Sequence, residues 1–252
     1  MNRFKLLMII FMLLATPQRV AYAQKQLMSV AIDHSPPYSY IDEKGRPRGL
    51  IVDVMDSLSA KLPYAFEYVE CPWARCLKLV EQGEIDLLPG IKKTPTREAV
   101  FVFIEPAFFN QANHFRFYSL KTSKPITQFD DLTSLTIGAL RGASHTPEFD
   151  DNSSINKTLF VDVSSMFNAL EKQRIDAFIY HDDTINPLLN EFDTRNAITA
   201  SPLNLPGKRQ GYIVISKDSK HIMRIPEITE QLSNMVENGD LERIFKQYGL
   251  AY

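Results

Sequence analysis

Residues 84–98 read EIDLLPGIKKTPTRE. The apolar run 85–88 predicts a buried strand, and Gly90 permits a turn after it. Thr94 is a favoured N-cap residue and Pro95 suits the first helical position, so we expect a helix to begin near Thr94. A strand that leads through a glycine turn into a capped helix start is typical of a site that binds an anion.

The anion would be held at the start of that helix. The first N–H groups of a helix have no partner within it, and the helix dipole places partial positive charge beside them. Arg97, in the first turn, would add a bidentate fork of donors for a carboxylate or phosphate. The alternative is that Arg97 is a solvated surface charge of little energetic consequence. Residues 84–98 alone leave both interpretations open.

The first residues of the chain are typical of an export signal. Arg3 and Lys5 precede the apolar run 6–15, and Ala-Tyr-Ala at 21–23 has the small-x-small pattern of a signal peptidase site. The apolar run is half of the roughly 20 residues that a membrane-spanning helix needs. We therefore expect residues 1–23 to be removed and the protein to reach the periplasm, without a lipid anchor.

Charge narrows the class of partner. Cleavage after residue 23 removes three cations and no acids, so the net charge of −2 becomes −5. An acidic balance argues against nucleic acid or an anionic membrane surface, both of which favour basic proteins. With 44% hydrophobic residues the chain has ample material for a packed core. A small molecule or a membrane protein remains as the expected partner, and we expect a monomer without a cofactor.

Cys71 and Cys76 are the two cysteines of the chain. In an oxidising compartment such a short spacing makes a small-loop disulfide plausible. Two buried thiols are the alternative, because helical geometry can hold such a pair beyond bridging distance. No C-x-x-C or H-E-x-x-H pattern occurs in the sequence, so we expect no metal site.

Strand and helix patterns alternate along the mature chain, which predicts a parallel α/β sheet. The expected strands are 27–32, 66–69, 85–88, 135–140, 158–161, 175–180 and 212–215, and the expected helices are 50–62, 74–82, 166–172, 228–236 and 241–248. The plan repeats, because Gln-Arg-Ile-Asp at 173–176 echoes Gly-Glu-Ile-Asp at 83–86. Two lobes of similar plan should therefore follow each other. Loops after the carboxyl ends of the strands would meet in a cleft between them.

At this level the chain resembles the extracellular solute-binding proteins of family 3, the polar amino-acid type of periplasmic binding protein. The resemblance covers essentially the whole mature chain. The segments that carry it are 35–38 (SPPY), 45–49, Asp53, Trp73, 83–86 (GEID), 94–97 (TPTR), 135–142, 174–177 (RIDA) and 238–249. It implies a type II periplasmic binding fold, with a ligand cleft between two lobes that are joined by two crossing strands. The implied boundaries are 24–111 with 208–252 for lobe 1, and 112–207 for lobe 2.

The resemblance also implies ligand-binding residues in lobe 1. Arg97 matches the arginine that grips a ligand carboxylate, and Trp73 matches a position that lines the ligand side chain. For Trp73 a place in the core is the alternative. The further lobe 1 residues expected at the ligand are Gly90, Lys92, Thr94, Ser35 and Tyr38, with Arg75 adding positive field.

In lobe 2 the turn from Gly142 to Ser144 matches the segment that meets the same carboxylate, and Arg141 would add positive field. Two departures from the family pattern concern ligand identity. Ser35 stands where the family usually has an aromatic residue. Amino-acid binders of the family have an aspartate that binds the ligand ammonium. At that position this chain has His181, and Asp182 follows it. An acidic or non-amino carboxylate is therefore a second choice beside an amino acid.

The function that these features imply is capture of a small carboxylate-bearing solute by lobe closure, for an ABC transporter. A dehydratase-like enzyme on the same fold is an alternative, with His181, Asp182 and His145 as candidate acids and bases. The simpler interpretation of each is a loop residue that forms structural hydrogen bonds. We therefore expect that the protein is not an enzyme. A protein that reports its ligand to a membrane receptor is a third possibility, which the sequence does not separate from transport.

Overall fold

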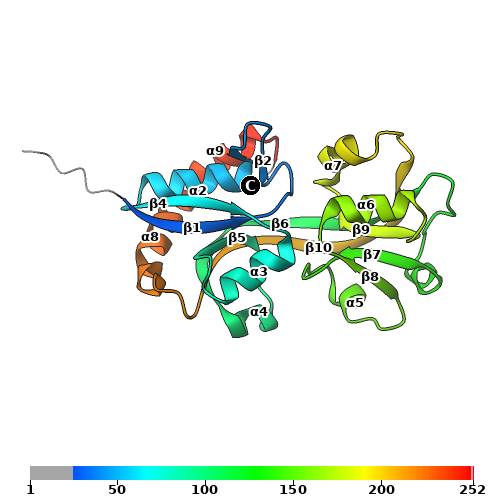
Figure 1. Ribbon diagram of the computed structural model, residues 1–252, viewed down its shortest axis with the longest axis horizontal. Helices are drawn as coiled ribbons and strands as arrows, with labels where there is room; N and C mark the ends of the chain where they lie inside the picture. The colour runs from blue at the N-terminus through cyan, green and yellow to red at the C-terminus, as the bar shows by residue number, and fades with distance from the viewer. Residues whose placement is uncertain (1–24, 251) are drawn as a thin grey trace, which may run out of the picture.

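Eight strands form one continuous sheet that passes through both lobes of the molecule (Figure 1). The computed structural model describes residues 25–250 and 252, so the predicted signal peptide, residues 1–23, lies outside the described residues. The strand order is β4-β1-β5-β10-β6-β9-β7-β8. The first three strands belong to lobe 1 and the last three to lobe 2, while β10 and β6 run between them. This arrangement confirms the expected two-lobed α/β fold.

Lobe 1 packs helices against both faces of three parallel strands, β1 (Gln26–Ile32), β4 (Tyr64–Glu70) and β5 (Leu87–Ile91). One face carries the larger core, to which α2, α8 and α9 contribute, and the other face carries a core with α3. The remaining elements are α2 (Leu50–Ala60), α3 (Trp73–Glu81), α4 (Pro95–Val100), η2 (Ile222–Arg224), α8 (Ile225–Glu237), α9 (Asp240–Gln247) and the hairpin β2 (Tyr40–Ile41) with β3 (Pro47–Arg48).

Lobe 2 repeats this plan, with β7 (Thr136–Leu140) parallel to β8 (Asn156–Phe160) and β9 (Ala177–His181). Two hydrophobic clusters again fill the two faces of the strands. The helices of this lobe are η1 (Phe129–Ser134), α5 (Pro147–Asp150), α6 (Val163–Glu171) and α7 (Ile185–Phe192). The expected helix 166–172 is therefore present with an earlier start.

The two connecting strands, β6 (Phe101–Leu120) and β10 (Ile198–Ser216), correct the prediction of a parallel sheet. They pair antiparallel with each other, β10 is antiparallel to β5, and β6 is antiparallel to β9. A chain that leaves lobe 1 and later returns to it must run in opposite directions on its two passages, so the sheet is mixed. The implied lobe boundaries fall opposite each other in this ladder, where Ala112 pairs with Lys208. Those boundaries stay a prediction.

The segment 84–98 forms the expected strand and helix, but the strand begins and ends later than predicted. β5 starts at Leu87 and continues to Ile91, so Gly90 lies within the strand and not in a turn after it. Its φ of 84° fits the register shift opposite this point of β5, because glycine tolerates that backbone conformation. The helix start is confirmed, since the Thr94 side chain accepts a hydrogen bond from the Arg97 backbone N–H at 3.4 Å.

The echo between the lobes has a structural cause in two carboxylates, of which Asp86 is buried and Asp176 is exposed. Asp86 accepts hydrogen bonds from the backbone N–H and hydroxyl of Ser29, at 2.8 and 2.9 Å, and so ties β5 to β1. Asp176 accepts from the Thr136 backbone N–H at 2.7 Å and ties β9 to β7 in the same way. The Ile-Asp pair of each lobe therefore fixes a parallel strand pair at its amino end.

The residue that ends the helix before each pair has a positive φ, 72° at Gly83 and 53° at Gln173. In both cases this residue donates to the carbonyl three residues back, at 3.0 Å to Val80 and at 2.9 Å to Leu170. Glycine adopts this left-handed conformation without the steric cost that a Cβ brings. Lobe 2 therefore carries a small strain that lobe 1 avoids.

Substitutions at these two positions should have opposite effects on stability. We expect Gly83→Ala to lower the free energy of unfolding by about 1 kcal/mol, and Gln173→Gly to raise it by about 0.5 kcal/mol. A Cβ at Gly83 would have no heavy atom closer than 4.0 Å, so the cost there is conformational and not a clash. Urea unfolding followed by circular dichroism measures both. Destabilisation by both substitutions would contradict this explanation.

Two features are missing from the described part of the chain. Within residues 25–250 and 252, no helix combines the length and the apolar character that crossing a bilayer requires. The same residues contain no group of three or more His, Cys, Asp or Glu side chains arranged to hold a metal ion.

Candidate ligand-binding site

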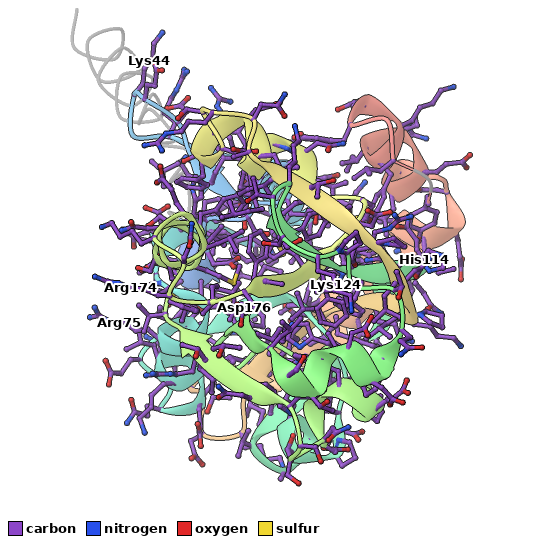
Figure 2. The ribbon with its side chains drawn as sticks, turned by 90° about the vertical axis from the view of Figure 1, so that its right-hand side faces the viewer. Lys44, Arg75, His114, Lys124, Arg174 and Asp176 are labelled. Carbon is purple, nitrogen blue, oxygen red and sulfur yellow. A yellow bond between two sulfur atoms is a disulfide. The ribbon has the colours of Figure 1, made fainter. Side chains whose placement is uncertain are left out.

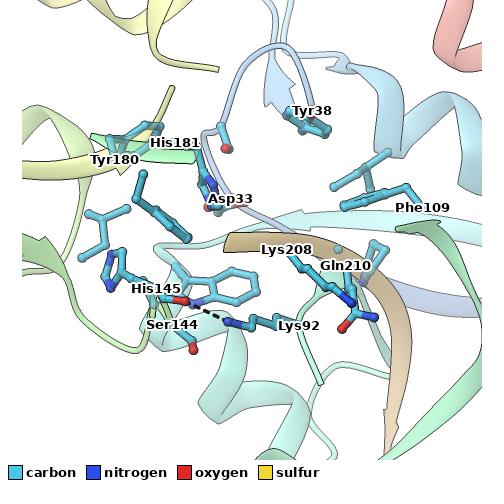
Figure 3. A pocket seen from close by; sticks show the side chains of 18 of the residues that line it. Asp33, Tyr38, Lys92, Phe109, Ser144, His145, Tyr180, His181, Lys208 and Gln210 are labelled. Atoms are coloured by element: carbon cyan, nitrogen blue, oxygen red, sulfur yellow. Dashed lines mark hydrogen bonds between the residues drawn. The ribbon is translucent and has the colours of Figure 1, made fainter. Parts of the chain in front are cut away.

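A cleft of about 140 Å³ lies between the lobes, at the carboxyl ends of β1, β5, β7 and β9 (Figure 3). Both connecting strands contribute side chains to it. Of the residues that the sequence singled out, those that line the cleft are Ser35, Tyr38, Trp73, Gly90, Lys92, Arg97, Ser144 and His181. Apolar side chains complete its walls, namely Ile51, Phe109, Phe115, Leu140 and Ile179.

Arg97 bridges the two lobes at one side of the cleft. Its Nη1 donates to the Lys92 carbonyl and its Nη2 to the Gly142 carbonyl, each at 2.8 Å. The guanidinium also lies 5.8 Å from the centre of the Trp73 ring, within the range of a cation–π contact. Burial lowers the pKa of Arg97 to about 10, so the side chain is charged at neutral pH.

Two further lobe 1 side chains contact the same turn of lobe 2. Lys92 donates from Nζ to the His145 carbonyl at 2.8 Å, and Trp73 donates from Nε1 to the Gly142 carbonyl at 3.0 Å. Burial lowers the pKa of Lys92, and the nearby charge of Asp150 partly opposes that effect. The positively charged wall of the cleft thus meets the carbonyl groups of the 142–145 turn.

Asp150, in α5, holds this turn in place. Its carboxylate accepts from the backbone N–H of His145 at 2.7 Å and from the His145 ring Nδ1 at 2.9 Å. Desolvation would raise the pKa of Asp150, but the hydrogen bonds and charge of His145 outweigh it, so the pKa is lowered. The ring of His145 packs edge-on against Phe115, 5.3 Å between centroids, and so supports the turn from within lobe 2.

His181 ends β9 and faces the cleft from lobe 2 (Figure 3). Its ring packs on Phe115 with 4.3 Å between centroids, and its Nδ1 lies 2.6 Å from Nδ2 of Asn113. Both neighbours belong to β6, so a connecting strand determines the orientation of the ring.

Two predicted residues lie beside the cleft and not on its wall. The Thr94 hydroxyl is used within its own helix turn, where it caps Arg97 and lies 3.1 Å from the hydroxyl of Thr96. Because α4 has only six residues, its dipole is short, and the charge available to an anion is that of the Arg97 side chain. Gly142 contributes its carbonyl to lobe contacts, as described above.

Three predicted residues are absent from the cleft. Arg75 and Arg141 are exposed, and Arg75 lies on the outside of the molecule in Figure 2. Asp182 does not face the cleft, because its carboxylate accepts from the Tyr118 hydroxyl at 2.9 Å and pairs with Arg116 at 3.1 Å. These three residues therefore do not line the cleft in this structure, and a role for them in ligand binding stays a prediction.

Sequence reasoning missed several polar residues of the cleft, above all Asp33, Lys208 and Gln210. Asp33 follows β1 directly, so the rule that strand ends meet at a cleft could have identified it. Lys208 and Gln210 lie on β10, in a part of that strand for which no strand was predicted. Residues 207–211 read GKRQG, which gave no apolar pattern to recognise.

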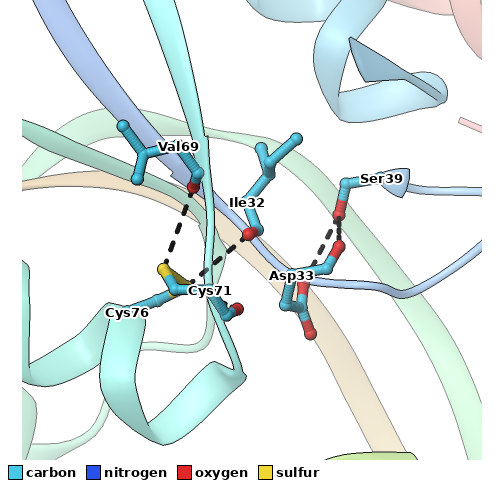
Figure 4. Close-up of a disulfide and its surroundings, with 6 residues drawn as sticks. All are labelled: Ile32, Asp33, Ser39, Val69, Cys71 and Cys76. Carbon is cyan, nitrogen blue, oxygen red and sulfur yellow. Dashed lines mark hydrogen bonds between the residues drawn. A yellow bond between two sulfur atoms is a disulfide. The ribbon is translucent and has the colours of Figure 1, made fainter. Parts of the chain in front are cut away.

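A disulfide joins Cys71 and Cys76 (Figure 4). It closes a loop of six residues, and Trp73 is one of them. The structure thus confirms the disulfide and not the pair of free thiols. The bridge joins the end of β4 to the first turn of α3, and both cysteines are buried. It therefore limits the movement of the loop that presents Trp73 to the cleft.

Loss of this bridge should lower stability moderately. For a loop this short, we expect the double variant Cys71→Ala/Cys76→Ala to lose about 2 kcal/mol of unfolding free energy, mainly because the unfolded chain gains freedom. Chemical unfolding with and without a thiol reductant measures the effect. The reductant should shift the wild-type midpoint and leave that of the double variant unchanged, and an equal shift in both would contradict the assignment.

Two lobes that enclose a cleft, with a basic wall on one side and a carbonyl-lined turn on the other, define a receptor that closes around a small solute. The chain belongs to the bacterial extracellular solute-binding proteins, family 3, whose family model matches residues 28–251.

Individual relatives are distant. The chain is 28% identical to the amino-acid-binding protein AabA of Dichelobacter nodosus, over 54% of this chain and 53% of that protein, so the match spans about half of either chain. It is 20% identical to a probable histidine-binding protein of Neisseria gonorrhoeae, over 84% of this chain and 78% of that protein. An ancestral arginine-binding protein with bound glutamine superposes with a TM-score of 0.76 at 18% identity, over 89% of this chain and 98% of that chain. At that identity, the superposition shows a shared fold.

Proposed function

We propose that this protein captures a small carboxylate-bearing solute, an amino acid or a related acid, and delivers it to an ABC transporter. The observation that supports this most is the convergence of Arg97, Lys92 and Trp73 on the 142–145 turn of the opposite lobe. These contacts join the two lobes across the cleft, so a ligand that binds both sides of it would stabilise the closed arrangement. A carboxylate is a group that a guanidinium and an ammonium at one wall bind well.

Trp73 provides a direct test, because it is the only tryptophan of the chain and lines the cleft. A fluorescence titration of the mature protein with amino acids and other small carboxylates should find a ligand that changes the emission. The same ligand should raise the melting temperature. If no carboxylate does either, the proposal is wrong.

A second measurement addresses catalysis. We propose that the protein releases its ligand unchanged, so mass spectrometry after prolonged incubation should recover only the starting compound. Conversion that depends on His181 would instead support the enzyme alternative. For the transport role, neighbouring genes for a permease and an ATPase would support the proposal, and a neighbouring sensor kinase would oppose it.

A further inference from the structure

The charged side chains on the wall of the cleft are mostly cationic. Among the described residues that line it, Lys92, Arg97 and Lys208 carry positive charge and Asp33 is the one carboxylate. Asp150 lies behind the wall and interacts with Lys92 and Arg97. Even when Asp150 is counted, the described cleft keeps a net positive charge. A zwitterionic ligand would leave that charge uncompensated when closure excludes water, which is unfavourable.

Asn113 fixes which ring nitrogen of His181 carries the proton. The backbone N–H of His114 donates to Oδ1 of Asn113 at 2.6 Å, so the side-chain amide must direct Nδ2 towards His181. Nδ2 is a donor, and Nδ1 of His181, 2.6 Å away, is therefore the acceptor. In this tautomer the ring proton is on Nε2, and a second proton on Nδ1 would place two donors face to face.

With Nδ1 engaged by Asn113 and the ring proton on Nε2, His181 has no acceptor left at the position where the family resemblance implies one for a ligand ammonium. An ammonium group has only donors to offer, so the two do not match. Asp182, the next carboxylate along the chain, is already held by Tyr118 and Arg116. The lobe 2 side of the cleft therefore disfavours a ligand ammonium at this position.

Lys208 supplies a further cation from β10. The side chains of Lys208 and Gln210 project from this strand into the cleft (Figure 3). Lysine and arginine side chains form several ion pairs with Asp or Glu within residues 25–250 and 252, and Lys208 takes part in none of these. Arg97 and Lys92, in contrast, interact with Asp150 behind the wall. A ligand that places its first carboxylate at Arg97 leaves Lys208 for a second anionic group.

We propose that the ligand is a short dicarboxylate that lacks an α-ammonium group. One carboxylate binds Arg97 and Lys92, and the other binds Lys208. This inference rests on the proposed function, because it assumes that the cleft is where the carboxylate binds. Asn113 acts as a positioning residue, since it sets the tautomer of His181 without touching the ligand.

Matched probes separate the two features of this ligand class. Succinate and aspartate differ by one ammonium group, and succinate and butyrate differ by one carboxylate; glutarate, glutamate and valerate repeat the comparison with a longer chain. We expect at least one dicarboxylate to bind about tenfold more tightly than both of its counterparts in the Trp73 fluorescence titration. Tighter binding of aspartate, glutamate or another α-amino acid would overturn the inference while leaving the carboxylate receptor intact. Failure of every probe and every amino acid would overturn both.

Two variants test the residues separately. Lys208→Gln should remove most of the advantage of the dicarboxylate over the monocarboxylate, whereas Lys220→Gln, exposed and outside the cleft lining, should not change it. His181→Asp, which introduces an acceptor, should shift the preference towards the amino-acid counterpart. If Lys208→Gln leaves the dicarboxylate preference intact, the assignment of the second carboxylate to Lys208 is wrong. That conclusion does not depend on whether a His181 variant folds.

Discussion

Arg97→Ala is expected to weaken binding of the best carboxylate ligand roughly 100-fold, a loss of about 3 kcal/mol. The guanidinium is charged, partly buried and held by the Lys92 and Gly142 carbonyls, so it meets an anion with little reorganisation. Its removal takes away the fork that matches a carboxylate and one of the contacts that join the lobes. Titration by Trp73 fluorescence measures the affinity, and melting without ligand checks that the variant folds.

Arg75→Ala is the matched control for this prediction. Arg75 belongs to the same lobe but is exposed and outside the cleft, so its removal should change affinity by less than about twofold. The affinity of Arg97→Lys for the ligand should lie between that of the wild type and that of Arg97→Ala, because lysine keeps the charge and lacks the planar fork. Equal binding by wild type and Arg97→Ala would show that Arg97 is the solvated charge of the alternative interpretation.

Gly49→Ala is expected to lower the free energy of unfolding by about 3 kcal/mol. Gly49 has a φ of 113°, and a Cβ there would lie 2.5 Å from the Tyr38 carbonyl oxygen, a backbone atom that has little room to move. That carbonyl and the one of Pro37 accept from the backbone N–H groups of Ile51 and Leu50, at 2.8 and 3.0 Å. The clash therefore falls on the contact that holds the Ser35–Tyr38 loop against α2. Urea unfolding measures the loss, and ligand affinity should also fall.

Gly45→Ala separates the clash from the conformational cost. Gly45 has a φ of 73°, and a Cβ there would have no heavy atom within 4 Å. Its substitution should therefore cost about 1 kcal/mol, from the backbone conformation alone. If the two substitutions cost the same, close approach to Tyr38 does not explain the glycine at position 49.

Local patterns account for the elements that were predicted correctly. Leu50, Val54 and Leu58 recur at helical spacing, and all three are fully buried in α2. Thr94 and Pro95 indicated a helix start because capping depends on residues close together in sequence. Arg97, Trp73 and His181 were expected at the ligand through the family resemblance, and all three line the cleft.

The connecting strands were not predictable from local patterns. β6 is twenty residues long and passes from one core through the cleft to the other, so the buried face of its side chains changes along its length. A strand of this kind has no constant period of two. The roles of Asn113 and Phe115, which lie on β6 and orient His181, were missed for the same reason.

The sequence by itself determined the class of fold and the helix start at Thr94, because capping, turn chemistry and apolar spacing act over a few residues. The family resemblance of the sequence indicated the arginine and the tryptophan that face the cleft. The tertiary structure alone decided which polar groups share the cleft. It turned Asp182 towards Tyr118 and Arg116, placed Lys208 and Asp33 on the wall and set the tautomer of His181 through Asn113. These outcomes depend on which partner a side chain finds across the sheet, and residues distant in sequence provide that partner.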